Sequence, residues 1–150
     1  MAHYLIFLGS TRTSTPPAPA RLGERVAKAC LQLFSAQRDT TVEIIDPLSL
    51  DLSGPFKPHF AYSASTVPDD LDALAIKIDQ ADGYVMVSPE YNHAMSPALI
   101  HLLNHFGASL FAFKPSAIVT YSMGQWGGTR AAVNMRSFLS ELGCLLVSAM

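Results

Sequence analysis

The stretch Leu5-Ile6-Phe7-Leu8-Gly9-Ser10-Thr11-Arg12 decides the fold. Four apolar residues in a row, ended by a glycine, are typical of a strand that is buried on both faces of a sheet. The hydroxyl and guanidinium groups that follow lie in the loop that leaves the carboxyl end of this strand. In an open parallel sheet, that edge is where ligands bind.

The alternation of strand and helix continues along the chain. Short apolar runs predict further strands at Thr41–Ile45, Tyr84–Val87, Ala117–Thr120 and Leu145–Val147. Apolar residues at helical spacing predict helices over 22–33, 71–78, 99–106 and 131–142. We therefore expect one α/β domain over residues 1–150, with a parallel sheet between two layers of helices.

Local signals place the ends of the helices. Asp69 and Asp70 are capping candidates for the second helix, and Ser96-Pro97 is typical of an N-cap followed by proline. Gly107 and Gly143 are expected to end the third and fourth helices.

Two stretches predict long loops, which in compact domains are usually functional or mobile. Residues 13–20 contain three prolines, and residues 51–67 are rich in aromatic residues and proline. The sequence stops at Met150, just after the fifth strand, where a covering helix is expected. Without that helix we expect an open apolar face, unless a second subunit covers it or the sequence is truncated.

Composition excludes several classes of function. The net charge is −2, the 150 residues contain no run of Lys or Arg, and nucleic acid is not an expected partner. Cys30 and Cys144 have no partner at metal-binding spacing, so no metal site is expected. No stretch has the length of a membrane span, and no signal peptide is recognisable, so we expect a cytoplasmic protein.

The loop after the first strand offers an anion site. Ser10, the backbone N–H groups of the loop and a helix N-terminus form a cradle, to which Arg12 adds a charged fork. Arg21 stands at the start of the helix and is placed to close on the same anion. Neither GxGxxG nor GxxxxGK[ST] is present, which excludes a dinucleotide fingerprint and a P-loop. A polar loop with a solvated Arg12 explains this loop equally well.

The loop after the third strand reads Ser88-Pro89-Glu90-Tyr91-Asn92-His93. Pro89 stiffens it, Tyr91 offers a flat face, and Asn92 tolerates unusual backbone dihedrals. An ordinary turn before the next helix is the alternative, in which Glu90 and His93 are surface residues.

The loop after the fourth strand, Ser122–Gly128, contains three glycines that let the backbone approach a ligand closely. Trp126 either stacks on a ring or fills a subunit contact, and a flexible turn is the alternative for the whole loop. Together, the three loops suit a flat mononucleotide such as FMN.

At these residues the chain resembles the NAD(P)H-dependent FMN reductase family, which includes quinone, chromate and azo-dye reductases. The resemblance extends from Leu5 to Val147. Residues 9–12 are similar to the family's GSxR loop, and residues 89–92 to its PEYN loop. Residues 114–131 are similar to its KP…GxxGGxRA segment.

The resemblance implies a flavodoxin-like fold: a doubly wound five-stranded parallel sheet in the order 2-1-3-4-5, here with the last helix missing. It also implies that the FMN phosphate is held by Ser10, Arg12 and Arg21. The isoalloxazine ring would be lined by Pro89, Glu90, Tyr91 and Asn92. The ring and ribityl chain would be followed by Ser122, Met123, Gly124 and Gly127. No catalytic residue is assigned, and His93 is the nearest candidate for proton delivery.

Two departures from the family pattern stand out. The phosphate loop is longer, with residues 13–20 inserted before Arg21. The helix that often reads PGxLKNAxDW is replaced by residues 96–105, and because relatives often use this helix in dimers, a different subunit interface is expected.

The expected function is transfer of hydride from NAD(P)H through bound FMN to a small-molecule acceptor such as a quinone or a flavin, in a homodimer or homotetramer. A flavodoxin-type electron carrier is the alternative, although such carriers are strongly acidic. A fragment that binds flavin poorly is a third possibility. A serine hydrolase is disfavoured because Ser10 and Ser122 lack a GxSxG elbow. The choice between NADH and NADPH stays open.

Overall fold

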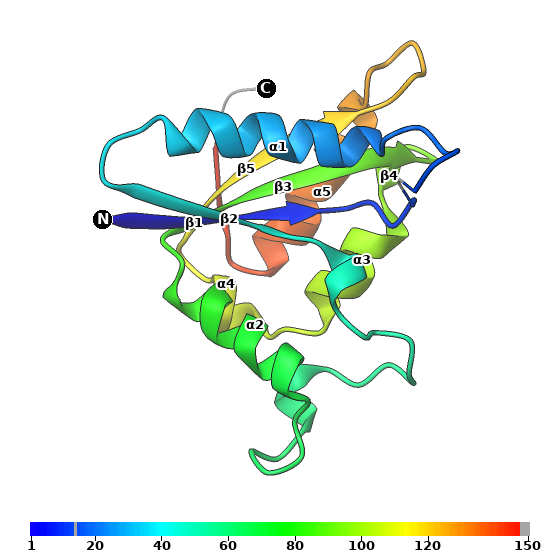
Figure 1. Cartoon of the computed structure of the whole chain (residues 1–150). Helices are drawn as coiled ribbons and strands as arrows, with labels where there is room; N and C mark the ends of the chain where they lie inside the picture. The colour runs from blue at the N-terminus through cyan, green and yellow to red at the C-terminus, as the bar shows by residue number, and fades with distance from the viewer. Residues whose placement is uncertain (14, 148–150) are drawn as a thin grey trace.

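A parallel sheet forms the centre of the computed structural model, which describes residues 1–13 and 15–147 (Figure 1). Its parallel strands lie in the order β2-β1-β3-β5-β6. Their bounds are β1 Ala2–Leu8, β2 Thr40–Ile45, β3 Gly83–Tyr91, β5 Pro115–Tyr121 and β6 Leu145–Leu146. The short strand β4, Ala94–Met95, pairs antiparallel with the end of β3.

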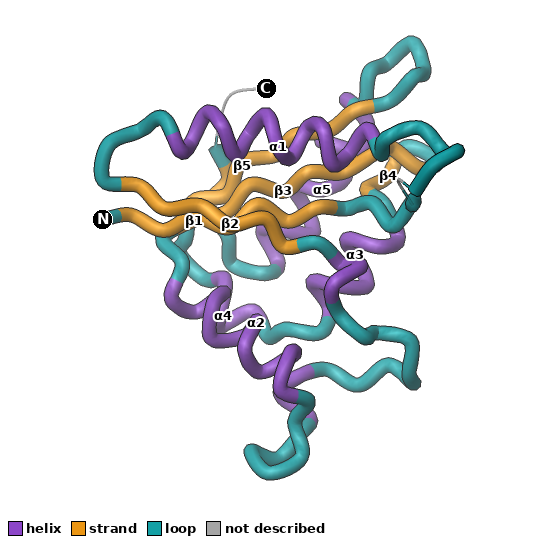
Figure 2. Tube along the Cα trace, viewed as in Figure 1, coloured by secondary structure: helices purple, strands orange, loops and turns teal. Residues whose placement is uncertain are grey.

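Helices cover both faces of the sheet (Figure 2). Helix α1 lies on one face, and α2 to α5 lie on the other. Their bounds are α1 Leu22–Ser35, α2 Asp69–Gln80, α3 Pro97–Asn104, α4 Ala108–Phe111 and α5 Thr129–Glu141. Two short 3₁₀ helices, Pro47–Ser49 and His59–Ala61, lie between β2 and α2.

Strand β1 supplies the core on both sides of the sheet. Leu5 and Phe7 belong to the cluster under α2 to α5, and Ile6 and Leu8 belong to the cluster under α1. All four side chains are at most 1% exposed. Their burial explains why this run carries no polar residue, since either face of the strand would place it in an apolar core.

The predicted fold class is confirmed: the five parallel strands follow the expected order, with helices on both faces. The strand β4 was not predicted, because two residues are too short to give a periodic signal. Helix α4 was not predicted either, because its four residues are too few to show a helical period.

The predicted role of Gly107 as a helix end is wrong. Helix α3 ends at Asn104, and Gly107 instead precedes α4 as its N-cap, with a φ of −73°. Gly143 has a φ of +79° shortly after α5, as expected for a residue that ends a helix.

The capping prediction for Asp69 and Asp70 is also wrong. The N-cap of α2 is Pro68, and both aspartates lie in the first turn of the helix. Their negative charges are favourable there because the helix dipole is positive at its N-terminus.

A buried hydroxyl network fixes the start of α3 against the end of β3. Ser96 is 1% exposed, and its Oγ accepts a hydrogen bond from the Leu99 N–H at 3.1 Å, as predicted for the N-cap. The Ser96 N–H donates to Ser88 Oγ at 2.9 Å, and the Ser88 hydroxyl donates to the Pro89 carbonyl at 2.9 Å. The loop that follows Val87 is therefore held at both ends.

Replacing Ser96 with alanine removes the acceptor for a buried N–H group of α3. We expect Ser96→Ala to lower the free energy of unfolding by about 1–2 kcal/mol, measured by urea denaturation. Ser137→Ala, at an exposed position of α5, is the matched control and should change stability by less than about 0.5 kcal/mol. Equal losses in the two variants would contradict the capping role.

Candidate functional site

The loop after β1 passes close over the end of β3. The Gly9 N–H donates to the Val87 carbonyl at 2.7 Å, and a Cβ at Gly9 would lie only 2.7 Å from the same oxygen. Only glycine fits this close approach. The next residue, Ser10, is buried, whereas Arg12 is exposed. Within residues 1–13 and 15–147, the Arg12 guanidinium forms no ion pair with a carboxylate.

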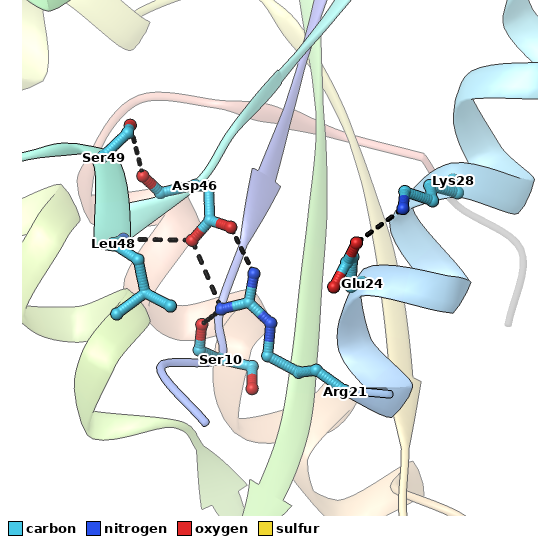
Figure 3. A network of polar contacts seen from close by, with 7 residues as sticks. All are labelled: Ser10, Arg21, Glu24, Lys28, Asp46, Leu48 and Ser49. Carbon is cyan, nitrogen blue, oxygen red and sulfur yellow. Dashed lines mark hydrogen bonds and ion pairs between the residues drawn. The ribbon is translucent and has the colours of Figure 1, made fainter. Parts of the chain in front are cut away.

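A partly buried ion pair supports this loop (Figure 3). The Arg21 Nη1 donates to the Ser10 carbonyl at 2.6 Å, and its Nη2 pairs with the Asp46 carboxylate at the end of β2. The other Asp46 oxygen accepts from the Leu48 N–H at 3.0 Å. Arg21 therefore joins the loop after β1, the start of α1 and the turn after β2. Direct contact between Arg21 and a phosphate stays a prediction.

The second loop is a tight hairpin between β3 and β4. Glu90 pairs with Met95 and Tyr91 with Ala94, which leaves Asn92 and His93 as the two turn residues. Both have positive φ angles, 50° and 65°, as a type I′ turn requires. The sequence-based expectation that Asn92 takes an unusual dihedral is confirmed.

Two side-chain contacts tie this hairpin to the start of α5. The Glu90 carboxylate accepts a hydrogen bond from the Ala131 N–H at 3.2 Å. Arg130 Nη1 donates to His93 Nε2 at 2.7 Å. The first contact places a negative charge at a helix N-terminus, where it is favourable. The second contact occupies Nε2 of His93, the residue that the sequence suggested as the nearest candidate for proton delivery.

The third loop turns through two glycines in left-handed conformations. Gly127 and Gly128 have φ angles of 59° and 94°. A Cβ at Gly128 would lie 2.8 Å from the Tyr121 nitrogen, so this position excludes larger residues. The Gly124 N–H donates to Ser122 Oγ at 3.0 Å, which orders the first half of the loop.

The three loops enclose a cavity of about 710 Å³ at the carboxyl edge of the sheet, within the range typical of small-molecule sites. Eight of the predicted site residues line it: Ser10, Arg12, Arg21, Pro89, Glu90, Tyr91, Ser122 and Met123. The predicted residues Asn92, Gly124 and Gly127 do not line it. The remaining lining residues are Thr13, Ala18, Pro19, Ala20, Leu22, Gly23 and Tyr121.

Sequence reasoning missed Tyr121, although it ends β5 at the edge where ligands bind. A Cβ at Gly23 would lie 2.4 Å from the Tyr121 hydroxyl, so α1 and β5 meet closely here. Burial raises the pKa of Tyr121, and the Tyr91 phenol adds to this effect. The Ser10 hydroxyl and the charges of Arg21 and Arg12 lower this pKa, but burial outweighs them. Tyr121 is therefore a neutral hydrogen-bonding group in the cavity wall.

The family model for NADPH-dependent FMN reductase matches residues 3–150. The chain belongs to the NADPH-dependent FMN reductase family. The match includes all three loops of the cavity and extends over nearly the whole sequence.

Individual relatives agree with this assignment over shorter stretches. A quinone reductase of Escherichia coli is 38% identical over 84 residues, which are 54% of this chain and 45% of that protein. An NADPH azoreductase of Bacillus sp. is 35% identical over 82 residues, 53% of this chain and 46% of that protein. The chain thus matches about half the length of these relatives.

A solved structure shows the same fold. The flavoenzyme NAD(P)H:(acceptor) oxidoreductase FerB from Paracoccus denitrificans superposes with a TM-score of 0.71 at 18% identity. The match covers 99% of this chain and 76% of that one.

One part of the family pattern, Lys114-Pro115, lies away from the cavity. The Lys114 ammonium donates to the Ile78 and Asp79 carbonyls at 2.8 and 2.6 Å, at the C-terminal end of α2. Burial lowers the pKa of Lys114, and the carboxylates of Asp79 and Asp82 oppose this. This lysine is a helix cap rather than a ligand contact.

Other kinds of site find no support in residues 1–13 and 15–147. No group of three or more His, Cys, Asp or Glu side chains is placed to hold a metal ion there. Within the same residues, no helix has both the length and the apolar character needed to cross a membrane.

The two ion pairs in Figure 3 can be compared to test how strongly the Arg21–Asp46 pair stabilises the protein. Replacing Asp46 with alanine leaves the buried Arg21 charge without its carboxylate and the Leu48 N–H without its acceptor. Because the Asp46 side chain is 30% exposed, we discount the cost of a fully buried pair. We expect a loss of about 2–3 kcal/mol in the free energy of unfolding, measured by urea denaturation.

Lys28→Ala is the control, because Lys28 and Glu24 form an exposed pair one helical turn apart, at 2.5 Å. We expect this variant to lose less than about 0.5 kcal/mol. A similar loss in both variants would show that Asp46 adds no special support.

Proposed function

We propose that this chain binds FMN in the 710 Å³ cavity and acts as an NAD(P)H-dependent oxidoreductase on small-molecule acceptors such as quinones or flavins. The observation that carries the proposal is the convergence of the three family loops on one cavity at the carboxyl edge of the sheet. The names of the quinone and azo-dye reductase relatives support the reaction class.

The residues of the cavity fit the parts of FMN. At the end formed by the loop after β1, the Arg12 guanidinium is exposed and has no carboxylate partner among the described residues, so it is available for a phosphate dianion. Ser10 lines the same cavity. Arg21 positions this loop through its contacts with Ser10 and Asp46.

At the other end, Pro89, Glu90 and Tyr91 supply a rigid wall for a flat ring. The hairpin that carries them is pinned by the Ser88 network and by the contact between Glu90 and Ala131. Ser122 and Met123 line the cavity from the third loop, where they would follow the ring and the ribityl chain.

When bound, FMN would supply the redox chemistry that couples NAD(P)H oxidation to reduction of the acceptor. The protein's part is to hold the phosphate, to keep the ring wall rigid and to limit access of water. No side chain of the cavity is assigned as an acid or a base. His93 is exposed, and its Nε2 already accepts from Arg130.

Assembly into a homodimer or homotetramer is part of the same proposal. The large apolar side chains of Leu48, Phe56 and Phe60 are more than half exposed, and a subunit contact would remove them from water.

An absorbance spectrum of the purified protein, before and after FMN addition, tests the proposal. We expect the visible absorption of bound flavin to appear and to bleach on anaerobic addition of NADPH or NADH. A protein that does not bind FMN contradicts the proposal. Bound FMN that neither nucleotide reduces favours a flavodoxin-type electron carrier.

Arg12 provides a sharper test of the phosphate end. Arg12→Gln removes a charge-assisted hydrogen bond to the phosphate, so we expect FMN to bind about 10- to 100-fold more weakly. The measurement is titration of flavin fluorescence. Arg38→Gln removes an exposed arginine from the α1–β2 connection at the opposite edge of the sheet. That control should leave FMN affinity unchanged, and an equal loss in both variants would reject a specific role for Arg12.

A further inference from the structure

Three exposed apolar or aromatic side chains, Tyr91, Met123 and Trp126, belong to two of the loops that line the cavity, and we call them the apolar rim. Tyr91 and Met123 line the cavity, and Met123 is fully exposed. Trp126 follows three residues later in the same loop and keeps 51% of its surface exposed. Large apolar side chains grouped at a cavity mouth are a common mark of a binding surface.

A cation lies against this rim. The guanidinium carbon of Arg130 is 4.7 Å from the centroid of the Trp126 ring, a cation–π distance. The stack fixes the planar guanidinium beside the indole, and the hydrogen bond to His93 fixes it from another side.

Nothing in residues 1–13 and 15–147 neutralises this charge. Arg130 forms no ion pair there. A guanidinium has no acceptor atom, so Arg130 is the donor in its hydrogen bond with His93. The Glu90 carboxylate accepts a hydrogen bond from the neighbouring Ala131 N–H. A positioned cation with several unused N–H donors therefore faces solvent beside the Trp126 indole.

We propose that Met123, Trp126 and Arg130 form a subsite that takes flat aromatic acceptors carrying an anionic group, such as a sulfonate, a carboxylate or an ionised hydroxyl. The ring packs on the apolar rim, and the anion meets the Arg130 guanidinium. This inference rests on the proposed function, since the subsite lies beside the cavity assigned to FMN. It adds a class of acceptor that the family resemblance leaves open.

The proposal predicts selectivity between acceptors that share a ring. The neutral and the anionic compound gain the same apolar contact, but only the anionic one gains a charge-assisted hydrogen bond. Because solvent screens the exposed Arg130, we expect a preference of about tenfold, and one that declines with salt.

Steady-state kinetics with 1,4-naphthoquinone and 1,4-naphthoquinone-2-sulfonate test this selectivity. The two quinones differ in intrinsic reactivity, so the informative quantity is the change in the ratio of their kcat/KM values on mutation. Arg130→Gln should lower kcat/KM for the sulfonate about tenfold and for the neutral quinone less than twofold. Arg130→Lys keeps the charge and should retain part of the preference.

Arg136→Gln is the matched control. Arg136 lies on the same helix and lines a separate cavity of about 650 Å³ beside β5. This variant should leave the ratio unchanged. Equal losses for both quinones in Arg130→Gln would indicate a purely structural role and overturn the proposal, as would an unchanged ratio.

A second readout does not depend on turnover. Trp126 is the only tryptophan of the chain, so its indole N–H gives a single side-chain resonance of that type in a ¹⁵N-labelled sample. We expect p-toluenesulfonate to shift this resonance at about tenfold lower concentration than the neutral p-toluenesulfonamide, and Arg130→Gln to remove the difference. Equal responses to both ligands, or no response to either, would overturn the subsite.

The titration is run on the purified protein with and without added FMN. Failure of FMN to bind would contradict the proposed function, whatever the tryptophan signal does. Bound FMN with no discrimination between the two ligands would overturn the subsite alone.

Discussion

The contact of Arg21 with Asp46 and the Ser10 carbonyl holds together the edge of the sheet on which the cavity depends. The Arg21 side chain is 3% exposed, and the Asp46 carboxylate offsets the desolvation cost of burying its charge. Its partners come from the loop after β1 and from the end of β2, which are joined through no direct strand pairing at that point. Without this support, the loop after β1 would depend on its backbone contact at Gly9 and on the hydrogen bond between the Ser10 and Tyr121 side chains.

A second set of contacts fixes the β3–β4 hairpin, whose residues line the opposite part of the proposed FMN cavity. Strand β3 continues past the sheet into a hairpin, and the Glu90 carboxylate fixes that hairpin to the N-terminus of α5. The glycine loop that precedes α5 is thereby held beside the hairpin. A contact between residues 41 positions apart in sequence thus joins two loops into one wall of the cavity.

Much of the fold could be predicted from local signals in the sequence, and the predictions that were wrong also have local causes. The Ser96-Pro97 start of α3 was predictable because the N-cap hydroxyl and the proline act within one turn. Gly107 was misassigned because a glycine near the end of an apolar helix stripe suits a C-terminal position, whereas its observed φ is negative. The aspartates at 69 and 70 were misassigned because the first turn and the N-cap favour the same residue types.

The sequence by itself determined the buried parallel strands, their alternation with helices, and therefore the edge at which three unusual loops meet. Apolar runs and helical spacing are local properties, and the carboxyl ends of parallel strands share one edge. Only the tertiary structure decided the partners of each polar side chain. The pairing of Arg21 with Asp46, 25 residues away, of Glu90 with Ala131, and of Arg130 with His93 depends on where separate elements meet in space. For that reason the sequence predicted where the three loops converge, and the packing of α1, the β3–β4 hairpin and α5 decided the contacts of their side chains.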